Sequence, residues 1–396
     1  MSRIDDMVAK LCPDGVEYRA LKDVCVRQRG TSITAAKMKE VADAAGDVLV
    51  YGAGKTRVRA KRASIGGAVN EMPSVVVKSR GVIGFEYCDQ PFTTKSELWS
   101  YRSDSSEVNI KFVYYYLSAN VDYFKGLAVT GKLPQITVGA TDNYEIPVPP
   151  LEIQQEIVRV LDSFAELEAE LEAELEARKA QYAHYRDKLL EFTERESVSW
   201  LKLGDIGTFK RGRRFTKADY RDCGIPSIHY ADIYTKLGTW TESAVAYVDE
   251  AKRTSLRYAQ PGDVVIACTG EDSDDIAKAV AWLGDEPAAV HDDCCVFHHE
   301  QNPRYIAYLF QTNRFARFKK RYATEAKMTR LSSERIAQFE VPVPPLDEQH
   351  RIVDILDRFD ALTTSLTDGL PAEIEARRQQ YEYYREKLLD FPRNAA

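Results

Sequence analysis

Three clusters of lysine and arginine contain the side chains whose type and spacing most favour one chemistry, the binding of phosphate groups. They occupy residues 55–62 (KTRVRAKR), 210–214 (KRGRR) and 314–322 (RFARFKKRY). Cationic side chains gain binding free energy on phosphates by releasing counterions. The alternative for any one cluster is an ordinary solvated surface. From the first two clusters we select as phosphate-contacting candidates Lys55, Arg57, Arg59, Lys61, Arg62, Arg211, Arg213 and Arg214.

Two aligned polar loops could contact bases. The segment TGKLPQI at 130–136 aligns with EAKMTRL at 325–331. Glutamine and arginine are the side chains that pair bidentately with the edges of adenine and guanine. A polar loop without a ligand is the alternative at each position. The aligned candidates for DNA contact in the two loops are Lys132, Gln135, Lys327 and Arg330.

Catalytic motifs are missing. The segment GAGKT at 52–56 resembles the end of a phosphate-binding loop, but that motif needs glycine where Leu49 stands. Residues 291–299 (HDDCCVFHH) include metal-ligating types without a second pair at zinc spacing, so we interpret them as a strand with alternating polar side chains. No nucleophile elbow, dinucleotide-binding glycine motif or zinc-deaminase signature occurs. The sequence therefore predicts no catalytic residue and no metal ligand.

An internal repeat organises the elements that would position these side chains. Residues 146–164 (IPVPPLEIQQEIVRVLDSF) align without a gap to 341–359 (VPVPPLDEQHRIVDILDRF), and residues 178–192 align to 377–391. The second copy has four more residues, near 369–371 (GLP). The chain is therefore predicted to be two units in tandem.

Each copy predicts a long helix that begins after a Pro-Pro pair, because proline restricts the residue before it and cannot continue a helix backwards. From Leu151 to Phe192 the first helix would extend on the order of 60 Å at 1.5 Å per residue. Its apolar stripe requires a second helix beside it. The predicted packing positions are Ile157, Leu161, Phe164, Leu167, Leu171 and Leu175 in the first copy, and Ile352, Leu356 and Phe359 in the second.

Within the first helix the tetrapeptide Ala-Glu-Leu-Glu occurs three times, over residues 165–176. Leucines four apart drift around a helix of 3.6 residues per turn, so they cannot hold a long heptad seam. One hypothesis is a molecular ruler in which each unit adds roughly 6 Å. The alternative is a solvated acidic helix.

Short β-branched runs such as 74–77 and 263–267, with helical patches at 111–125 and 303–322, indicate α+β domains. The net charges are +3 for residues 1–145, −6 for 146–192, 0 for 193–340 and −4 for 341–396, so the acidity lies in the long helices and not in the domains. We take these four ranges as first domain, first spacer helix, second domain and second spacer helix.

Composition also bears on the compartment. The seven cysteines form no disulfide framework, and the first twenty residues are charged. We expect a cytoplasmic protein that is neither exported nor membrane-spanning.

The chain contains the same unit twice: a variable domain, then the motif Ile-Pro-Val-Pro-Pro-Leu-x-x-Gln-x-x-Ile-Val-x-x-Leu-Asp, then a long helix. This arrangement closely resembles the specificity subunit of Type I restriction-modification systems. The most specific segments are 146–162 and 341–357, supported by 74–84, 130–137 and 262–266. The resemblance covers nearly the whole chain. The second copy departs from the first because it lacks the Ala-Glu-Leu-Glu units and contains Gly369-Leu-Pro371, which questions the continuity of its helix.

The resemblance implies an α+β fold of two tandem α/β target recognition domains, each followed by a long helix, with the helices forming an antiparallel coiled coil of pseudo-twofold symmetry. It implies a non-catalytic subunit that binds double-stranded DNA and docks two modification (methyltransferase) subunits, which restriction subunits then join. S-adenosylmethionine, ATP and Mg would be bound by those partners, and no cofactor by this chain. Since the two domains differ, the DNA target should be asymmetric and interrupted.

Two alternatives from other classes are a self-contained DNA-modifying enzyme and a coiled-coil scaffold unrelated to DNA. Methyl transfer by the isolated chain would favour the first, which the missing motifs oppose. Salt-dependent DNA binding together with a modification subunit would exclude the second.

Overall fold

The computed structural model describes residues 3–129, 133–192, 198–271, 276–324, 328–364 and 369–394. The chain divides into two compact units. Unit 1 comprises Met1–Glu172 with Ile374–Ala396, and unit 2 comprises Ala173–Glu373. Each unit therefore combines one globular domain with parts of both long helical segments. The four predicted sequence ranges instead keep each long helix as one separate segment.

The first domain contains two main sheets and a short strand pair. The order β2-β8-β5-β6 forms one sheet, β4-β3-β7 the second, and β1-β9 the pair. The strands are β1 (Tyr18–Ala20), β2 (Val26–Arg29), β3 (Val48–Tyr51), β4 (Arg57–Ala60), β5 (Ser74–Lys78), β6 (Gly84–Cys88), β7 (Phe92–Thr94), β8 (Trp99–Arg102) and β9 (Glu145–Pro147). The helices are α1 (Arg3–Leu11), α2 (Leu21–Val24), α3 (Ala35–Glu40), α4 (Ile110–Ala119), α5 (Val121–Gly126) and α6 (Val138–Asp142).

The second domain contains two five-stranded sheets, β11-β21-β17-β19-β14 and β12-β15-β13-β20-β16, with the pairs β10-β23 and β18-β22. Its earlier strands are β10 (Ser199–Lys202), β11 (Gly207–Arg211), β12 (Tyr220–Arg221), β13 (Ile225–Ile228), β14 (Trp240–Thr241), β15 (Ala246–Val248) and β16 (Tyr258–Ala259). Its later strands are β17 (Val264–Ala267), β18 (Thr269–Gly270), β19 (Ala279–Trp282), β20 (Ala288–Val290), β21 (Cys294–His299), β22 (Thr329–Arg330) and β23 (Glu340–Val343). The helices are α8 (Leu203–Ile206), α9 (Tyr230–Thr235), α10 (Pro303–Leu309), α11 (Asn313–Tyr322) and α12 (Ser333–Ile336).

The predicted α+β composition is confirmed in both domains. The β-branched runs form the buried strands β5 and β17, and each predicted helical patch forms two helices, α4 with α5 and α10 with α11. A shared feature is a parallel strand pair, β3 with β7 in the first domain and β13 with β20 in the second. The interpretation of 291–299 as a strand holds for Cys294–His299, while residues 291–293 form the turn before it. The polar alternation predicted there is wrong, because Cys294 to Phe297 are all buried.

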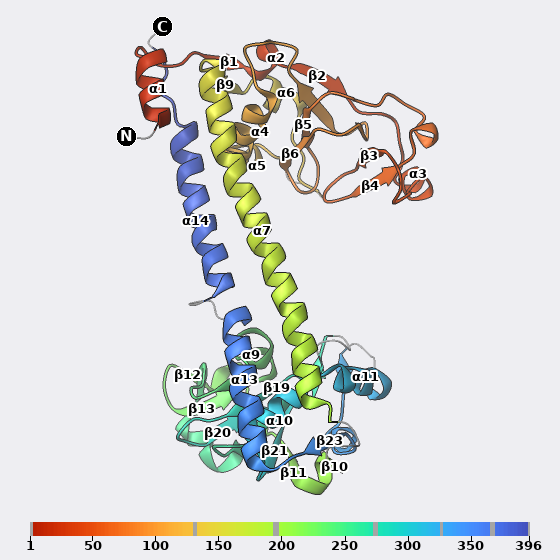
Figure 1. The fold of residues 1–396 in the computed structure, drawn as a ribbon, viewed down its shortest axis with the longest axis vertical. Helices are drawn as coiled ribbons and strands as arrows, with labels where there is room; N and C mark the ends of the chain where they lie inside the picture. The colour runs from red at the N-terminus through yellow and green to blue at the C-terminus, as the bar shows by residue number, and fades with distance from the viewer. Residues whose placement is uncertain are drawn as a thin grey trace. The chain divides into compact units, whose positions relative to one another are not determined.

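The first long helix, α7 (Leu151–Leu190), has 40 residues. It is continuous in Figure 1. Its start is fixed by Gln154, whose side chain is fully buried. The Gln154 amide Nε2 donates to the Pro149 carbonyl at 2.7 Å, and its Oε1 accepts the Asn109 backbone N–H at 2.8 Å. Asn109 in turn caps α4, so the glutamine of the proline-rich motif joins the spacer helix to its domain.

The second spacer is divided. α13 (Leu346–Thr364) and α14 (Leu370–Leu389) are separate helices, and Gly369 has φ of 87°, which is incompatible with a right-handed helix. The doubt raised by Gly369-Leu-Pro371 is therefore justified. α13 repeats the anchoring of α7, because Gln349 donates to the Pro344 carbonyl and accepts the Asn302 N–H.

Each unit contains an antiparallel helix pair. In unit 1, Phe164 of α7 stacks on Tyr384 of α14 with ring centroids 5.6 Å apart. In unit 2, Phe359 of α13 stacks on Tyr185 of α7 at 6.1 Å. These are the same two positions of the repeat with the helices exchanged, so the internal homology relates the two ring pairs to each other.

The predicted packing positions are buried to different degrees. The side chains nearest each helix start, Ile157, Leu161, Ile352 and Leu356, are at most 1% exposed and join the domain cores. The positions of intermediate exposure are Phe164, Leu167, Leu171, Leu175 and Phe359. The intermediate exposure of the repeat leucines agrees with a row that drifts around the helix. Within the described residues, no helix combines the length and apolar character that a membrane span requires.

Candidate nucleic-acid interface

The first basic cluster lies on β4, the outer strand of its sheet, and on the residues next to it, and most of its cations pair with carboxylates. Arg57 pairs with Glu86 at 2.6 Å, and Lys61 pairs with Asp43 at 3.2 Å. Arg62 lies between Asp47 and Glu71, and Arg59 donates to the Gln90 side chain at 2.8 Å. These side chains are exposed, but their existing partners reduce the charge that they offer to phosphates.

Lys55 differs from the rest of the cluster. It is exposed in the turn before β4, and its side chain makes no hydrogen bond or ion pair within the described residues. The Gly54 N–H of the same turn donates to the Arg80 carbonyl at 3.0 Å, and Arg80 forms an antiparallel bridge with Gln135. The backbone thus places the turn containing Lys55 beside the segment containing Gln135, far away in sequence.

Arg80 is a candidate that the sequence analysis missed. It is exposed between the Lys55 turn and Gln135, and its side chain makes no hydrogen bond or ion pair in the described part of the chain. The signal was present in the run Lys78-Ser-Arg-Gly81 after a buried strand. Lys78 itself is buried, and its burial lowers its pKa although Glu86 opposes the shift. Only Arg80 of this pair is available to a ligand.

The second domain builds the same segment. Arg330 on β22 pairs with Thr269, as Gln135 pairs with Arg80, and it bridges Thr324 as Gln135 bridges Val129. Both Gln135 and Arg330 are exposed. The alignment of the two loops is therefore confirmed at the level of backbone pairing. Lys132 and Lys327 lie outside the described residues.

The second basic cluster, residues 210–214, contains two arginines whose side chains have no partner among the described residues. Arg211, at the end of β11, donates from Nε to the Asp292 carbonyl at 2.7 Å and is held on the turn between β20 and β21. Arg213 and Arg214 are exposed, and among the described residues neither side chain has a hydrogen-bond or ion-pair partner. Gly212 between Arg211 and Arg213 has no room for a Cβ, which would meet the His291 carbonyl at 2.1 Å. This close approach of the Gly212 backbone to the His291 carbonyl places the backbone of both arginines beside the turn, while their side chains stay exposed.

In the third cluster, on α11, Arg314 and Lys319 make contacts within the second domain. The Arg314 guanidinium lies 4.0 Å from the centre of the Trp200 ring, and burial lowers its pKa. Lys319 donates to the Ile276 carbonyl at 3.2 Å. These contacts hold α11 on the domain.

Matched contacts attach each domain to its helix start. Tyr115 donates to Asp162 at 2.6 Å, and Tyr308 donates to Asp357 at 2.6 Å. Burial and the bound carboxylate raise the pKa of each tyrosine, so both hydroxyls remain donors. The repeated sequence therefore attaches each domain to its long helix by the same tyrosine–aspartate contact.

Comparisons with known proteins agree with this geometry. The model of the family described as Type I restriction modification DNA specificity domain matches residues 13–177 and 196–376. The EcoR124I/EcoR124II specificity subunit of Escherichia coli is 35% identical over 303 residues, which cover 73% of this chain and 73% of that protein.

Two solved structures share the fold. The Type I restriction-modification S subunit from M. genitalium aligns with a TM-score of 0.55 at 16% identity, over 95% of this chain and 96% of that one. A chain of the structure described as the basis of complex assembly and conformational transition of the type I R-M system aligns with a TM-score of 0.61 at 12% identity, over 95% and 98%. The two family matches and the relative together show that this chain belongs to the specificity subunits of Type I restriction-modification systems, with two DNA specificity domains in tandem.

Proposed function

We propose that the first domain reads one half of an interrupted DNA target and the second domain reads the other. The supporting observation is the matched pair Gln135 and Arg330, two exposed side chains that can read bases and that occupy equivalent bridged segments of the two domains. Because the two side chains differ, the half-sites should differ too. Lys55 and Arg80 in the first domain, and Arg213 and Arg214 in the second, would contact phosphates.

The long helices would set the distance between half-sites and dock two modification subunits. Catalysis would lie in those partners, with S-adenosylmethionine for adenine methylation and with ATP and Mg for cleavage by restriction subunits. The absence of catalytic motifs from the sequence supports this division of labour.

Arg330→Ala tests the proposal in a complete methyltransferase complex. A bidentate contact to a base is worth about 1–3 kcal/mol of discrimination, so sequence preference should relax at one position of one half-site. Mapping of methylated sites in host DNA is the measurement. Gln135→Ala is the matched variant and should relax the other half-site. A complex in which both variants keep the full wild-type target would disprove the base-reading assignment.

A further inference from the structure

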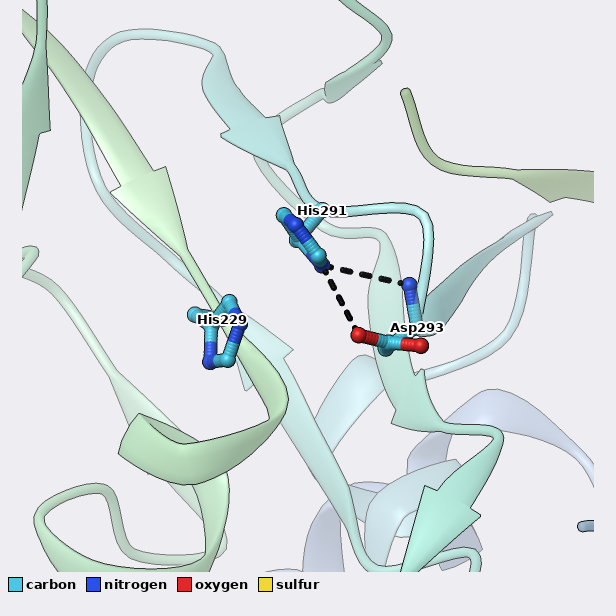
Figure 2. Close-up of side chains that lie close together, drawn as sticks. All are labelled: His229, His291 and Asp293. Atoms are coloured by element: carbon cyan, nitrogen blue, oxygen red, sulfur yellow. Dashed lines mark hydrogen bonds and ion pairs between the residues drawn. The ribbon is translucent and has the colours of Figure 1, made fainter. Parts of the chain in front are cut away.

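The turn between β20 and β21 gathers two imidazoles and a carboxylate. His229 follows β13, while His291 and Asp293 belong to the turn (Figure 2). A potential ligand atom from each lies within 4.8 Å of the other two. Histidine nitrogen and carboxylate oxygen are ligands that zinc and its neighbours in the first transition row prefer.

Hydrogen bonding determines which nitrogen of His291 faces this cluster. Nε2 lies 3.1 Å from the Phe215 carbonyl oxygen, which can only accept, so Nε2 carries a proton and donates it to this bond. Nδ1 lies 3.2 Å from an Asp293 carboxylate oxygen and 3.3 Å from one of Asp292. The Asp293 N–H, at 3.3 Å, is its only other polar neighbour among these contacts. A cation bound between Nδ1 and these two carboxylates would interact favourably with all three groups.

The first domain supplies such a cation at the same place. The Lys95 N–H donates to the Tyr51 carbonyl at 2.9 Å, and the His291 N–H donates to the Ile228 carbonyl at 3.1 Å. These bonds join equivalent parallel strands, so Lys95 is the structural counterpart of His291.

The carboxylate has a counterpart as well. Glu97 lies two residues after Lys95, as Asp293 lies two residues after His291, and the Lys95 ammonium is 2.6 Å from the Glu97 carboxylate. Both side chains of this ion pair are mostly buried, with 19% and 18% exposed. The second domain replaces the ammonium by an imidazole and adds a second imidazole from His229.

We propose that His229, His291 and Asp293 bind one divalent transition-metal ion of the zinc class, with water completing the coordination. His291 would contribute Nδ1, and its Nε2–H bond to the Phe215 carbonyl is the outer contact that orients metal-binding histidines. His229 Nδ1 accepts the Ala231 N–H at 3.2 Å, which orients the ring at the start of α9.

The ion would connect the start of α9, the turn, and the segment 211–215. Arg211 and Phe215 already contact this turn through the Asp292 carbonyl and the His291 ring. A bound ion would therefore hold together the segments that support the second basic cluster. The inference concerns contacts within the second domain and does not rest on DNA recognition.

Calorimetric titration of the full-length protein with Zn²⁺ tests the site, with Mg²⁺ as the comparison ion. We expect one Zn²⁺ per chain and a visible absorption band when Co²⁺ replaces it. His229→Ala and Asp293→Ala should each weaken Zn²⁺ binding at least about 10-fold, because loss of an outer contact alone costs that much. His350→Ala removes an exposed histidine on α13 and should leave binding unchanged.

His291→Lys is the variant designed to keep the fold, because it copies the Lys95–Glu97 pair of the first domain. It should retain wild-type thermal stability without metal, lose Zn²⁺ binding, and lose the stabilisation by Zn²⁺ that the wild type shows. The proposal is overturned if wild-type protein shows no saturable 1:1 binding. It is also overturned if His291→Lys binds as the wild type does, or if His350→Ala weakens binding as much as His229→Ala.

Discussion

The basic residues fall into two groups, those paired with carboxylates and those without such a partner, and the sequence alone does not distinguish them. Arg57 and Lys61 face carboxylates of their own domain, whereas Arg213 and Arg214 have no such partner in the described residues. A phosphate must compete with Glu86 for Arg57 but not with any described acid for Arg213. Free cations should thus contribute most to DNA affinity.

Arg213→Ala should weaken DNA binding of the assembled complex on every sequence and reduce the slope of log affinity against log salt by about one. The measurement is a salt titration of binding. Arg253→Ala is the matched control, because Arg253 is exposed in the same domain but already paired with Glu250 at 2.6 Å. An equal change of slope in both variants would contradict the division into free and paired cations.

His299 gives the second domain a pH-dependent stability. Its Nδ1 accepts the Gln301 N–H, its Nε2 has no partner in the described residues, and burial lowers its pKa to about 4. The unfolded chain takes up the proton near its ordinary value of 6.5 and the folded chain only near 4. Stability is therefore complete above that ordinary value and falls as pH decreases, by roughly 3 kcal/mol in total.

His299→Asn keeps an acceptor for the Gln301 N–H and removes the titration. Urea unfolding monitored by tryptophan fluorescence should show a smaller loss of stability for this variant than for the wild type between about pH 6.5 and about pH 4. Identical losses would show that His299 is not the group responsible.

Side-chain partners were the part of the site that the sequence could not provide. The matched loops with Gln135 and Arg330 were predictable because they lie at a fixed distance from the repeated helix start. Arg80 was missed because only the folded chain places the residues after β5 beside the Gln135 segment. The pairing of Arg57 with Glu86 also depends on two strands that are distant in sequence.

Among the elements, α7 combines two functions in one helix. Its first turns are fixed to the domain by Gln154, and its middle is the threefold Ala-Glu-Leu-Glu segment. Arg378 of α14 pairs with both Glu168 and Glu172, which are equivalent positions of successive repeat units. A sequence with this periodicity offers the same contact after a shift by one unit.

Deletion of Ala169–Glu172 should therefore shorten α7 by about 6 Å and rotate the C-terminal part of the helix by roughly 40°, while Glu176 replaces Glu172 opposite Arg378. The two half-sites should persist with a shorter unspecified spacer, by one or two base-pair steps of about 3.4 Å. Mapping methylated sites for the deletion variant measures the spacer. An unaltered spacer in an active complex would identify the repeat as a solvated helix face only.

The division of the second spacer illustrates the limit of periodicity as a guide. The Pro-Pro pairs and the apolar stripe predicted both long helical segments. Gly369 indicated where the second segment is interrupted. The stacking of Phe164 on Tyr384 required three-dimensional pairing. Sequence indicated which residues needed partners, and the fold identified the partners.

Across the whole chain, the tandem units make recognition modular. Each domain has its own core, its own bridged segment and its own matched attachment to a helix start. The family relationship and the α+β composition could be inferred from the repeat, but the exact sheet orders could not, because outside the repeated segments the two domains diverge in sequence.

Exchange of residues 18–145 for the matching domain of a relative should change one half of the DNA target and leave the other half intact. The physical reason is that Arg330 and its supporting strands lie in unit 2, outside the exchanged residues. Sequencing of methylated host DNA is the measurement. A chimera with both halves altered would show that the domains do not read independently.

The composition of unit 1 has a consequence for synthesis on the ribosome. Its core includes Leu388, Leu389 and Phe391 together with Ile153 and Ile157, so this domain is completed by a segment that is translated after the second domain. Unit 2 is continuous from Ala173 to Glu373 and can close earlier. A nascent chain that stops before α14 would thus present an apolar face of α7 to chaperones and proteases, and chains that include α14 would cover it.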